Sequence, residues 1–238
     1  MKKTPNSRRN LDLAIQHSFS EGHNYLEVRT VMANTIVAQM LPNGAIKGGS
    51  AIKFRLGYGG TRFTNDLDTV YRTGLKEFIA DYEAKLKNGW CGFTGKIVTK
   101  TPAKPKDVPT EYVMQPFEVK LSYNGKPWIT VILEVGHNEI GDGDKPDWGM
   151  SSDVISIFEE LGFPAPKPVA LMPLPHQIAQ KLHGLSEQGS ERAHDLIDLQ
   201  LIVANADLDL RKTREICERL FEYRKKQKWP PTITIGNN

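Results

Sequence analysis

Two aspartates one residue apart, Asp66 and Asp68, are the side chains in this sequence best suited to catalysis. They lie in the run Arg62-Phe63-Thr64-Asn65-Asp66-Leu67-Asp68-Thr69-Val70-Tyr71. Because side chains alternate between the two faces of a strand, both carboxylates would point to one face. Carboxylates placed in this way can hold two divalent cations about 3.5–4 Å apart. Mg²⁺ prefers oxygen ligands and often binds through one or two carboxylates together with substrate phosphates. The pair therefore predicts a site for Mg²⁺ or Mn²⁺.

A glycine turn, Lys47-Gly48-Gly49-Ser50, precedes the two aspartates. Glycines allow a backbone turn to approach a phosphate closely, and a helix that begins near Ser50 would add partial positive charge there. The apolar side chains of Ala51, Ile52, Phe54 and Leu56 predict that helix, which the glycine at position 57 would end. Alone, a Gly-Gly-Ser is usually an ordinary turn, and an Asp-x-Asp is usually a solvated strand edge. The order of turn, helix, loop and acidic strand is more specific, and it indicates transfer of a phosphoryl or nucleotidyl group.

A third carboxylate, Glu134, lies in the run 129–135, which is rich in β-branched residues and predicts a buried strand. Residues 117–123 alternate apolar and polar side chains, and Asn124-Gly125 predicts a tight hairpin turn after them. Glu134 would therefore lie on the second strand of an antiparallel hairpin. A carboxylate there is costly to desolvate unless it is paired or bound to a metal. Two interpretations stay open, a third metal ligand and an exposed strand end.

Lys181 and Asp195 lie on two predicted helices, Leu174–Leu185 and Glu191–Ile202. Lys181 flanks the apolar stripe of the first helix. Asp195 and Asp198 are three residues apart and share a face of the second. The functional interpretation places Lys181 and Asp195 in a polar active site. The alternatives are a solvated helix face and an internal Lys181–Asp195 ion pair.

Three sequence motifs together resemble those of AbiEii/AbiGii-type nucleotidyltransferase toxins, in the polymerase-β-like nucleotidyltransferase superfamily. They are Lys47-Gly48-Gly49-Ser50-Ala51, then Arg62 to Asp68, and Lys181 followed by Arg192-Ala193-His194-Asp195-Leu196-Ile197-Asp198. The resemblance covers residues 30–203, with gaps. It implies an α+β fold with a mixed β-sheet flanked by helices and followed by a C-terminal helical half.

The resemblance also implies what the matching residues do. NTP would be the substrate, bound by a set that comprises Lys47, Gly48, Gly49, Ser50 and Lys181. Asp66 and Asp68 would hold the metal, with Glu134 as the third carboxylate, and Asp195 would complete the polar catalytic site. Some family members are toxins of toxin–antitoxin or phage-defence systems, and some modify tRNA ends. An RNA acceptor, tRNA in particular, and a cognate antitoxin protein are therefore the expected partners. His194 stands where the family often has a basic residue.

Two other functions remain open from the sequence. One is a nucleotidyltransferase or phosphotransferase that acts on a protein or a small molecule. The other is a non-catalytic NTP-binding module that works through a partner. The intact Asp-x-Asp favours an enzyme, because NTP binding by itself does not require that pair.

Composition limits the class of protein. Hydrophobic residues make up 39% of the 238 residues, which is typical of a globular fold. No apolar run approaches the length of a membrane span, and the N-terminus has no signal-peptide pattern. Cys91 and Cys217 are isolated, as expected of reduced thiols in the cytoplasm. We expect a cytoplasmic protein that does not engage a membrane.

Charge and proline content predict how the chain is organised. The net charge is only +3, but basic residues gather near the C-terminus, and Arg224, Lys225 and Lys226 are predicted RNA contacts. The alternative for this segment is a solvated terminal helix.

Five prolines between residues 164 and 175 predict a boundary between an N-terminal domain, 1–168, and a C-terminal helical domain, 169–238. Residues 11–41 and 75–86 are predicted to be helical.

Overall fold

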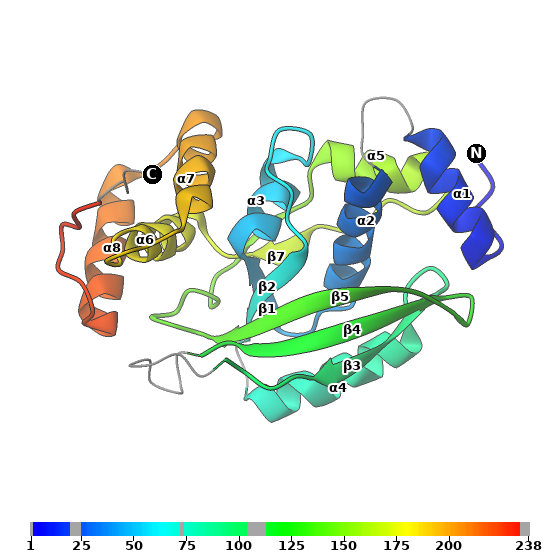
Figure 1. The fold of residues 1–238 in the computed structure, drawn as a ribbon, viewed down its shortest axis with the longest axis horizontal. Helices are drawn as coiled ribbons and strands as arrows, with labels where there is room; N and C mark the ends of the chain where they lie inside the picture. Colours follow the sequence, from blue (N-terminus) through cyan, green and yellow to red (C-terminus); the bar gives the residue numbers. More distant parts are fainter. Residues whose placement is uncertain (1, 20–24, 72–73, 104–112, 234–238) are drawn as a thin grey trace. The chain divides into compact units, whose positions relative to one another are not determined.

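A computed structural model describes residues 2–19, 25–71, 74–103 and 113–233. The chain forms two compact units (Figure 1). The first comprises Met1–His137 with Trp148–Leu171, and the second comprises Asn138–Asp147 with Met172–Asn238. Compactness does not test whether each part folds by itself, so the predicted domain division after residue 168 stays a prediction.

The first unit contains a mixed sheet with strand order β3-β4-β5-β2-β1-β7-β6. Strand pairs β2/β5 and β1/β7 are parallel, whereas β1/β2, β3/β4 and β4/β5 are antiparallel. The predicted fold class is therefore confirmed. The strands are β1 (Gly44–Lys47), β2 (Asp66–Tyr71), β3 (Phe93–Thr99), β4 (Gln115–Tyr123), β5 (Lys126–His137), β6 (Asp147–Gly149) and β7 (Val169–Leu171). The helices are α1 (Arg8–Ser18), α2 (Tyr25–Gln39), α3 (Gly48–Leu56), α4 (Leu75–Asn88) and α5 (Ser152–Glu160).

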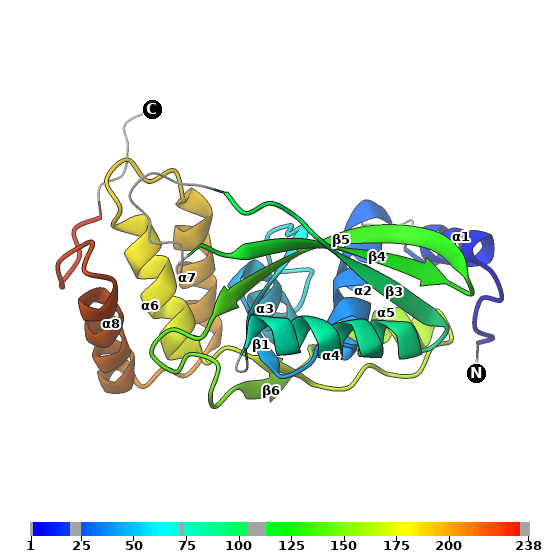
Figure 2. The ribbon, with the colours of Figure 1, turned by 90° about the horizontal axis from the view of Figure 1, so that it is seen from below.

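Strands β3 to β5 bury one face against helices and leave the other exposed. Figure 2 shows α2 and α4 on the same side of these strands. On β5, Val131 and Leu133 are buried, while Thr130 and Ile132 are exposed, so the faces alternate with the period of a strand. Burial of the apolar face fixes the register of β5, because a slip by one residue would turn Leu133 outward.

The predicted hairpin is confirmed, since β4 and β5 pair antiparallel around Asn124-Gly125. Both turn residues have positive φ, 46° at Asn124 and 75° at Gly125. Asparagine and glycine tolerate this region, and a turn with two such residues matches the twist of the flanking strands.

Other local predictions need correction. The stretch 11–41 forms two helices, because α1 ends at Ser18, before Phe19 takes φ −128° and ψ 31°. Of the run from Arg62 to Tyr71, only Asp66–Tyr71 forms strand β2. Strands β3, β6 and β7 and helix α5 were not predicted. These strands carry little apolar alternation, and β6 and β7 are three residues long.

The second unit contains α6 (Leu174–Leu185), α7 (Ala193–Asn205) and α8 (Leu210–Arg224). Helix α6 has the predicted bounds, and α7 begins two residues later than predicted. The loop that follows β5 is fastened to these helices, with Gln180 donating to Asp142 at 2.7 Å and Arg224 to Glu139 at 2.6 Å. In the described ranges, no helix is both long and apolar enough to cross a bilayer.

Candidate active site

Asp66 and Asp68 lie at the start of β2, where both side chains are half-buried and Leu67 is fully buried on the opposite face. The shared face that the sequence predicts for the two aspartates is therefore present. Asp68 pairs with Glu134 on the parallel strand β5 and with Lys47 on the antiparallel strand β1. Directly paired residues point to the same face of a sheet, so Lys47, Asp68 and Glu134 form one row across three strands.

Electrostatics in this row favour a bound cation. Burial raises the pKa of the Glu134 carboxyl, the Asp66 carboxylate raises it further, and Lys47 acts in the opposite direction. The Lys47 ammonium extends along the face toward Gly136, where an added Cβ would lie 3.1 Å from Nζ. Negative charge gathered on one half-buried face is unfavourable, and Lys47 offsets only part of it.

The glycine turn packs directly onto Asp68. Gly48 has φ +65°, and an added Cβ would lie 2.1 Å from Asp68 Oδ2. At Gly49 an added Cβ would lie 2.6 Å from Thr64 Oγ1. Any side chain at either position would displace a neighbour, and Gly48 also needs a backbone conformation that glycine adopts readily. The turn thereby brings the N-terminus of α3 next to Asp68. We call the carboxylates of Asp66, Asp68 and Glu134 the carboxylate row.

Ser50 has a structural contact that the sequence did not reveal. Ser50 is 2% exposed, and its hydroxyl donates to the backbone oxygen of Asp66 at 2.7 Å. The side chain therefore links α3 to the start of β2. Because Ser50 lies in the first turn of α3, its backbone N–H belongs to the group that lacks intrahelical partners and can face an anion. Phosphate binding by Ser50 stays a prediction.

The carboxylate row fits a divalent cation by its chemistry. Asp66, Asp68 and Glu134 supply hard oxygen donors on one face, and a cation would relieve the repulsion that raises the Glu134 pKa. Among the described residues, no three His, Cys, Asp or Glu side chains are gathered closely enough to form a ligand set. The assignment of the three carboxylates as metal ligands therefore stays a prediction.

Lys181 is part of a buried ion cluster in the second unit. Its ammonium donates to Asp195 at 2.8 Å and to Asp198 at 2.6 Å, and Arg192 donates to Asp195 at 2.6 Å. Lys181 is 5% exposed, and each of the two aspartates is 1% exposed. The structure thus forms the Lys181–Asp195 ion pair that the sequence left open. The structure adds Asp198 to this ion pair. The sequence indicated this only through the three-residue spacing that places Asp198 on the same helix face as Asp195.

The cluster holds Asp195 in its charged form. Burial by itself would raise the pKa of the Asp195 carboxyl, but Lys181 and Arg192 outweigh it and lower the pKa below its ordinary value. Buried charges of this kind are stable only when paired, so the four side chains depend on one another. The phosphate-binding role of Lys181 and the catalytic role of Asp195 stay predictions.

The three predicted RNA contacts differ in environment. Arg224 is half-buried, and its guanidinium binds Glu139 Oε2 through two nitrogens at 3.0 and 2.6 Å. Lys225 ends α8 in the left-handed conformation, and Lys226 is exposed after it. Arg224 therefore fastens the loop of the second unit, whereas Lys225 and Lys226 present their charge to solvent. RNA contact by all three stays a prediction.

One family model matches this chain, and several solved structures resemble it. The family described as "Nucleotidyl transferase AbiEii toxin, Type IV TA system" matches residues 31–237. MenT4, a nucleotidyltransferase toxin from Mycobacterium tuberculosis H37Rv, shares the fold with a TM-score of 0.59 and 18% identity, over 87% of this chain and 68% of that one. A protein from H. pylori aligns with a TM-score of 0.42 and 16% identity, over 85% of this chain and 83% of that one. The antibiotic-resistance factor ANT(2'')-Ia aligns with a TM-score of 0.40 and 14% identity, over 82% and 91%. No curated protein sequence matches the chain significantly.

Replacement of Gly48 by alanine tests the tight packing of the turn. We expect Gly48→Ala to lower the free energy of unfolding by at least about 1–2 kcal/mol, because alanine disfavours positive φ and its Cβ collides with Asp68. Urea denaturation measures the loss. Gly60→Ala is the matched control, since an added Cβ there meets nothing within 4 Å. Equal stability of the two variants would contradict the packing.

Glu134→Gln tests the repulsion within the carboxylate row. The pKa of the Glu134 carboxyl is raised in the folded state, so its contribution to stability is fully present below its ordinary pKa. This contribution is lost as pH rises through the pKa of the folded state. We therefore expect Glu134→Gln to be more stable than the wild type at neutral pH, without Mg²⁺, and the difference to vanish in acid. Thermal melts across that pH range measure it, with the exposed Glu83→Gln as the control. A variant less stable than the wild type at neutral pH would count against the repulsion.

The buried cluster of the second unit gives a larger expected effect. Lys181→Ala should cost about 3–5 kcal/mol of stability, because two buried carboxylates lose their shared cation. The exposed ion pair Arg214–Glu218 is the control, and Arg214→Ala should cost less than about 1 kcal/mol. Similar losses in the two variants would refute the importance of the buried cluster.

Asp195 also predicts how stability depends on pH. Because its folded pKa is lowered, its stabilising contribution is present above its ordinary pKa and is lost as pH falls through the folded value. Asp195→Asn should therefore reduce the acid-dependent part of the unfolding free energy. Denaturation of wild type and variant at a series of acidic pH values measures this, and parallel curves would rule it out.

Proposed function

Since this chain belongs to the AbiEii nucleotidyltransferase toxin family of type IV toxin–antitoxin systems, we propose that it transfers nucleotides from an NTP to the end of an RNA. The proposed acceptor is tRNA, the proposed site of action is the cytoplasm, and the proposed partner is a cognate antitoxin protein. The observation that best supports this function is the row of Lys47, Asp68 and Glu134, with the Gly48-Gly49 turn packed against it.

The proposed reaction is an in-line displacement at the α-phosphorus of the NTP. The terminal hydroxyl of the acceptor forms a new P–O bond, the bond to pyrophosphate breaks, and pyrophosphate leaves. Asp66 and Asp68, with Glu134, would hold Mg²⁺ or Mn²⁺, which when bound supplies charge stabilisation for the phosphoryl oxygens.

The chain's own groups bind the triphosphate and move the proton. Backbone N–H groups in the first turn of α3, at Gly49 and Ser50, would bind phosphate oxygens together with Gly48. The Lys47 ammonium, already on the carboxylate face, would offset negative charge on the NTP. Glu134, which lies beside Asp68, would accept the proton of the attacking hydroxyl.

The second unit contributes further basic groups to the proposal. Lys181, held between Asp195 and Asp198, would neutralise phosphate charge, and Asp195 would keep this ammonium in place. Lys225 and Lys226, with Arg224 beside them, would contact RNA phosphates. Such contacts position an RNA but do not specify its sequence.

Asparagine substitutions test the proposed catalysis. We expect Asp66→Asn or Asp68→Asn to slow transfer by about a thousandfold or more, equivalent to about 4 kcal/mol, because a metal ligand is lost. Purified protein is incubated with each labelled NTP, Mg²⁺ or Mn²⁺, and total RNA or total protein, and products are resolved on gels. Asp81→Asn, at an exposed position of α4, is the matched control and should keep full activity.

The same assay decides between acceptors. Label on RNA, tRNA in particular, supports the proposal, whereas label only on protein or on a small molecule would replace the RNA acceptor. If wild type and Asp66→Asn label RNA at equal rates, the carboxylate assignment fails. NTP binding without label on any acceptor would favour the non-catalytic module.

A further inference from the structure

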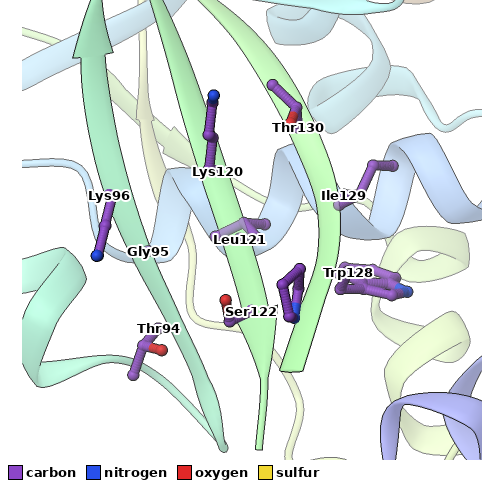
Figure 3. A pocket seen from close by; sticks show the side chains of 10 residues that line it. Thr94, Gly95, Lys96, Lys120, Leu121, Ser122, Trp128, Ile129 and Thr130 are labelled. Atoms are coloured by element: carbon purple, nitrogen blue, oxygen red, sulfur yellow. The ribbon is translucent and has the colours of Figure 1, made fainter. Parts of the chain in front are cut away.

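The exposed face of strands β3 to β5 carries side chains in rows that cross the sheet. One row is Lys96, Lys120 and Thr130, which pair directly across the three strands. The neighbouring row contains Val98, Glu118 and Ile132. Lys96, Lys120 and Thr130 line a hollow of about 480 Å³. Figure 3 shows them over three adjacent strands. We call this surface, made by Lys96, Lys120, Thr130 and Ile132, the lysine face.

The lysine face is continuous with the carboxylate row. Ile132 pairs with Asp66 on β2, so the row of Val98, Glu118 and Ile132 ends at a candidate metal ligand. Glu134 is two residues beyond Ile132 on the same strand and points to the same side. Thr130 and Glu134 are four positions apart on the strand, which corresponds to about 13 Å. An extended strand of nucleic acid that lies on the lysine face can therefore place its end at Glu134.

Charge on this face is arranged for an anion. Lys96 and Lys120 lie directly opposite each other on neighbouring strands, and their side chains extend in opposite directions along the sheet (Figure 3). Glu118 offsets part of the charge, with Lys100 at 2.9 Å and Lys120 at 3.6 Å from its carboxylate. The ammonium groups of Lys100 and Lys120 thus share one carboxylate. Phosphates bound at Lys96 and at Lys120 would neutralise the remaining positive charge.

Exposed apolar groups on the same face suit nucleobases. Ile132 is 42% exposed and Val98 is 38% exposed, although both belong to regular strands. Flat, apolar base surfaces can pack on such side chains, while phosphates bind the lysines. The combination of basic and apolar groups fits a single-stranded nucleic acid better than it fits a small anion.

We propose that the lysine face binds the acceptor RNA a few nucleotides before its terminal hydroxyl. The proposal rests on the proposed function, because the bound strand must end at a group that transfers nucleotides. Lys96 and Lys120 bind its phosphates, and Ile132 packs against a base next to the carboxylate row. The lysines are positioning residues that hold the acceptor and take no part in the chemical step.

The test compares Lys96→Ala/Lys120→Ala with Lys76→Ala/Lys87→Ala, in which two exposed lysines of α4, on the other side of the sheet, are removed. Both variants lose the same charge. The first should raise the KM for RNA at least about fivefold and leave kcat and the KM for NTP unchanged, while the second should match the wild type. For the Lys96→Ala/Lys120→Ala variant, the slope of log affinity for RNA against log salt concentration should be shallower by about 1.4 than for the wild type. Each lost phosphate contact with a single strand accounts for about 0.7 of this difference. The melting temperature of the first variant should stay close to that of the wild type, because both lysines are exposed.

Each outcome has a separate meaning. If the wild type labels RNA, and both variants have the same KM for RNA and the same salt dependence as the wild type, the lysine face is not the acceptor site. The proposed function then stands. If the wild type labels no RNA, the proposed function fails, and this proposal fails with it. If the lysine substitutions weaken binding of an antitoxin protein but not of RNA, the face is a protein interface and the proposal is wrong. Should the alanine variant melt at a lower temperature, Lys96→Gln/Lys120→Gln, which keeps long polar side chains, repeats the comparison.

Discussion

One strand register determines the geometry of the candidate site. The parallel pairing of β2 with β5 sets Glu134 beside Asp68, and the antiparallel pairing of β1 with β2 sets Lys47 on its other side. A slip of either pair by one residue would send the paired side chain to the opposite face. Buried Leu67 and Leu133 prevent that slip, because each would have to leave the core. The apolar face of the sheet therefore specifies the arrangement of its polar face.

The polar face combines charges that are costly without a ligand. Glu134 is half-buried near Asp66, and Lys47 compensates in part. The glycine turn brings backbone N–H groups close to the same carboxylates, where only glycine fits. Such local conflicts are common at functional sites, since the groups that bind a substrate cannot also be fully satisfied in its absence. The second unit shows the opposite solution, in which Lys181 and its two aspartates satisfy each other.

The open side of β3, β4 and β5 extends the polar face beyond the carboxylates. The row that starts at Asp66 and Ile132 lies next to the row of Lys96, Lys120 and Thr130 on the same face of the sheet. A sheet with helices on only one face provides such a surface, because the side chains on its free face do not have to pack against a helix. The same sheet can thereby carry a compact core on one face and an extended binding surface on the other.

Sequence by itself determined the features that depend on neighbours along the chain. Asn124-Gly125 predicted the hairpin, the apolar stripe predicted α6, and the spacing of Asp66 and Asp68 predicted their common face. The motifs also predicted the family, and the match of the family model over residues 31–237 confirms this prediction. These features follow from local backbone preferences and from the period of a helix or strand. Short strands such as β6 and β7, and the break between α1 and α2, lacked such a signal.

Only the tertiary structure decided which distant groups meet. The row of Lys47, Asp68 and Glu134 requires two strand pairings, and parallel pairing has no local sequence signal. The bond from Ser50 to the backbone of Asp66, and the ion pair of Arg224 with Glu139, likewise join separate segments. Sequence could name these residues as candidates from their chemistry. Their partners depend on which surfaces become buried together, and burial is a property of the whole fold.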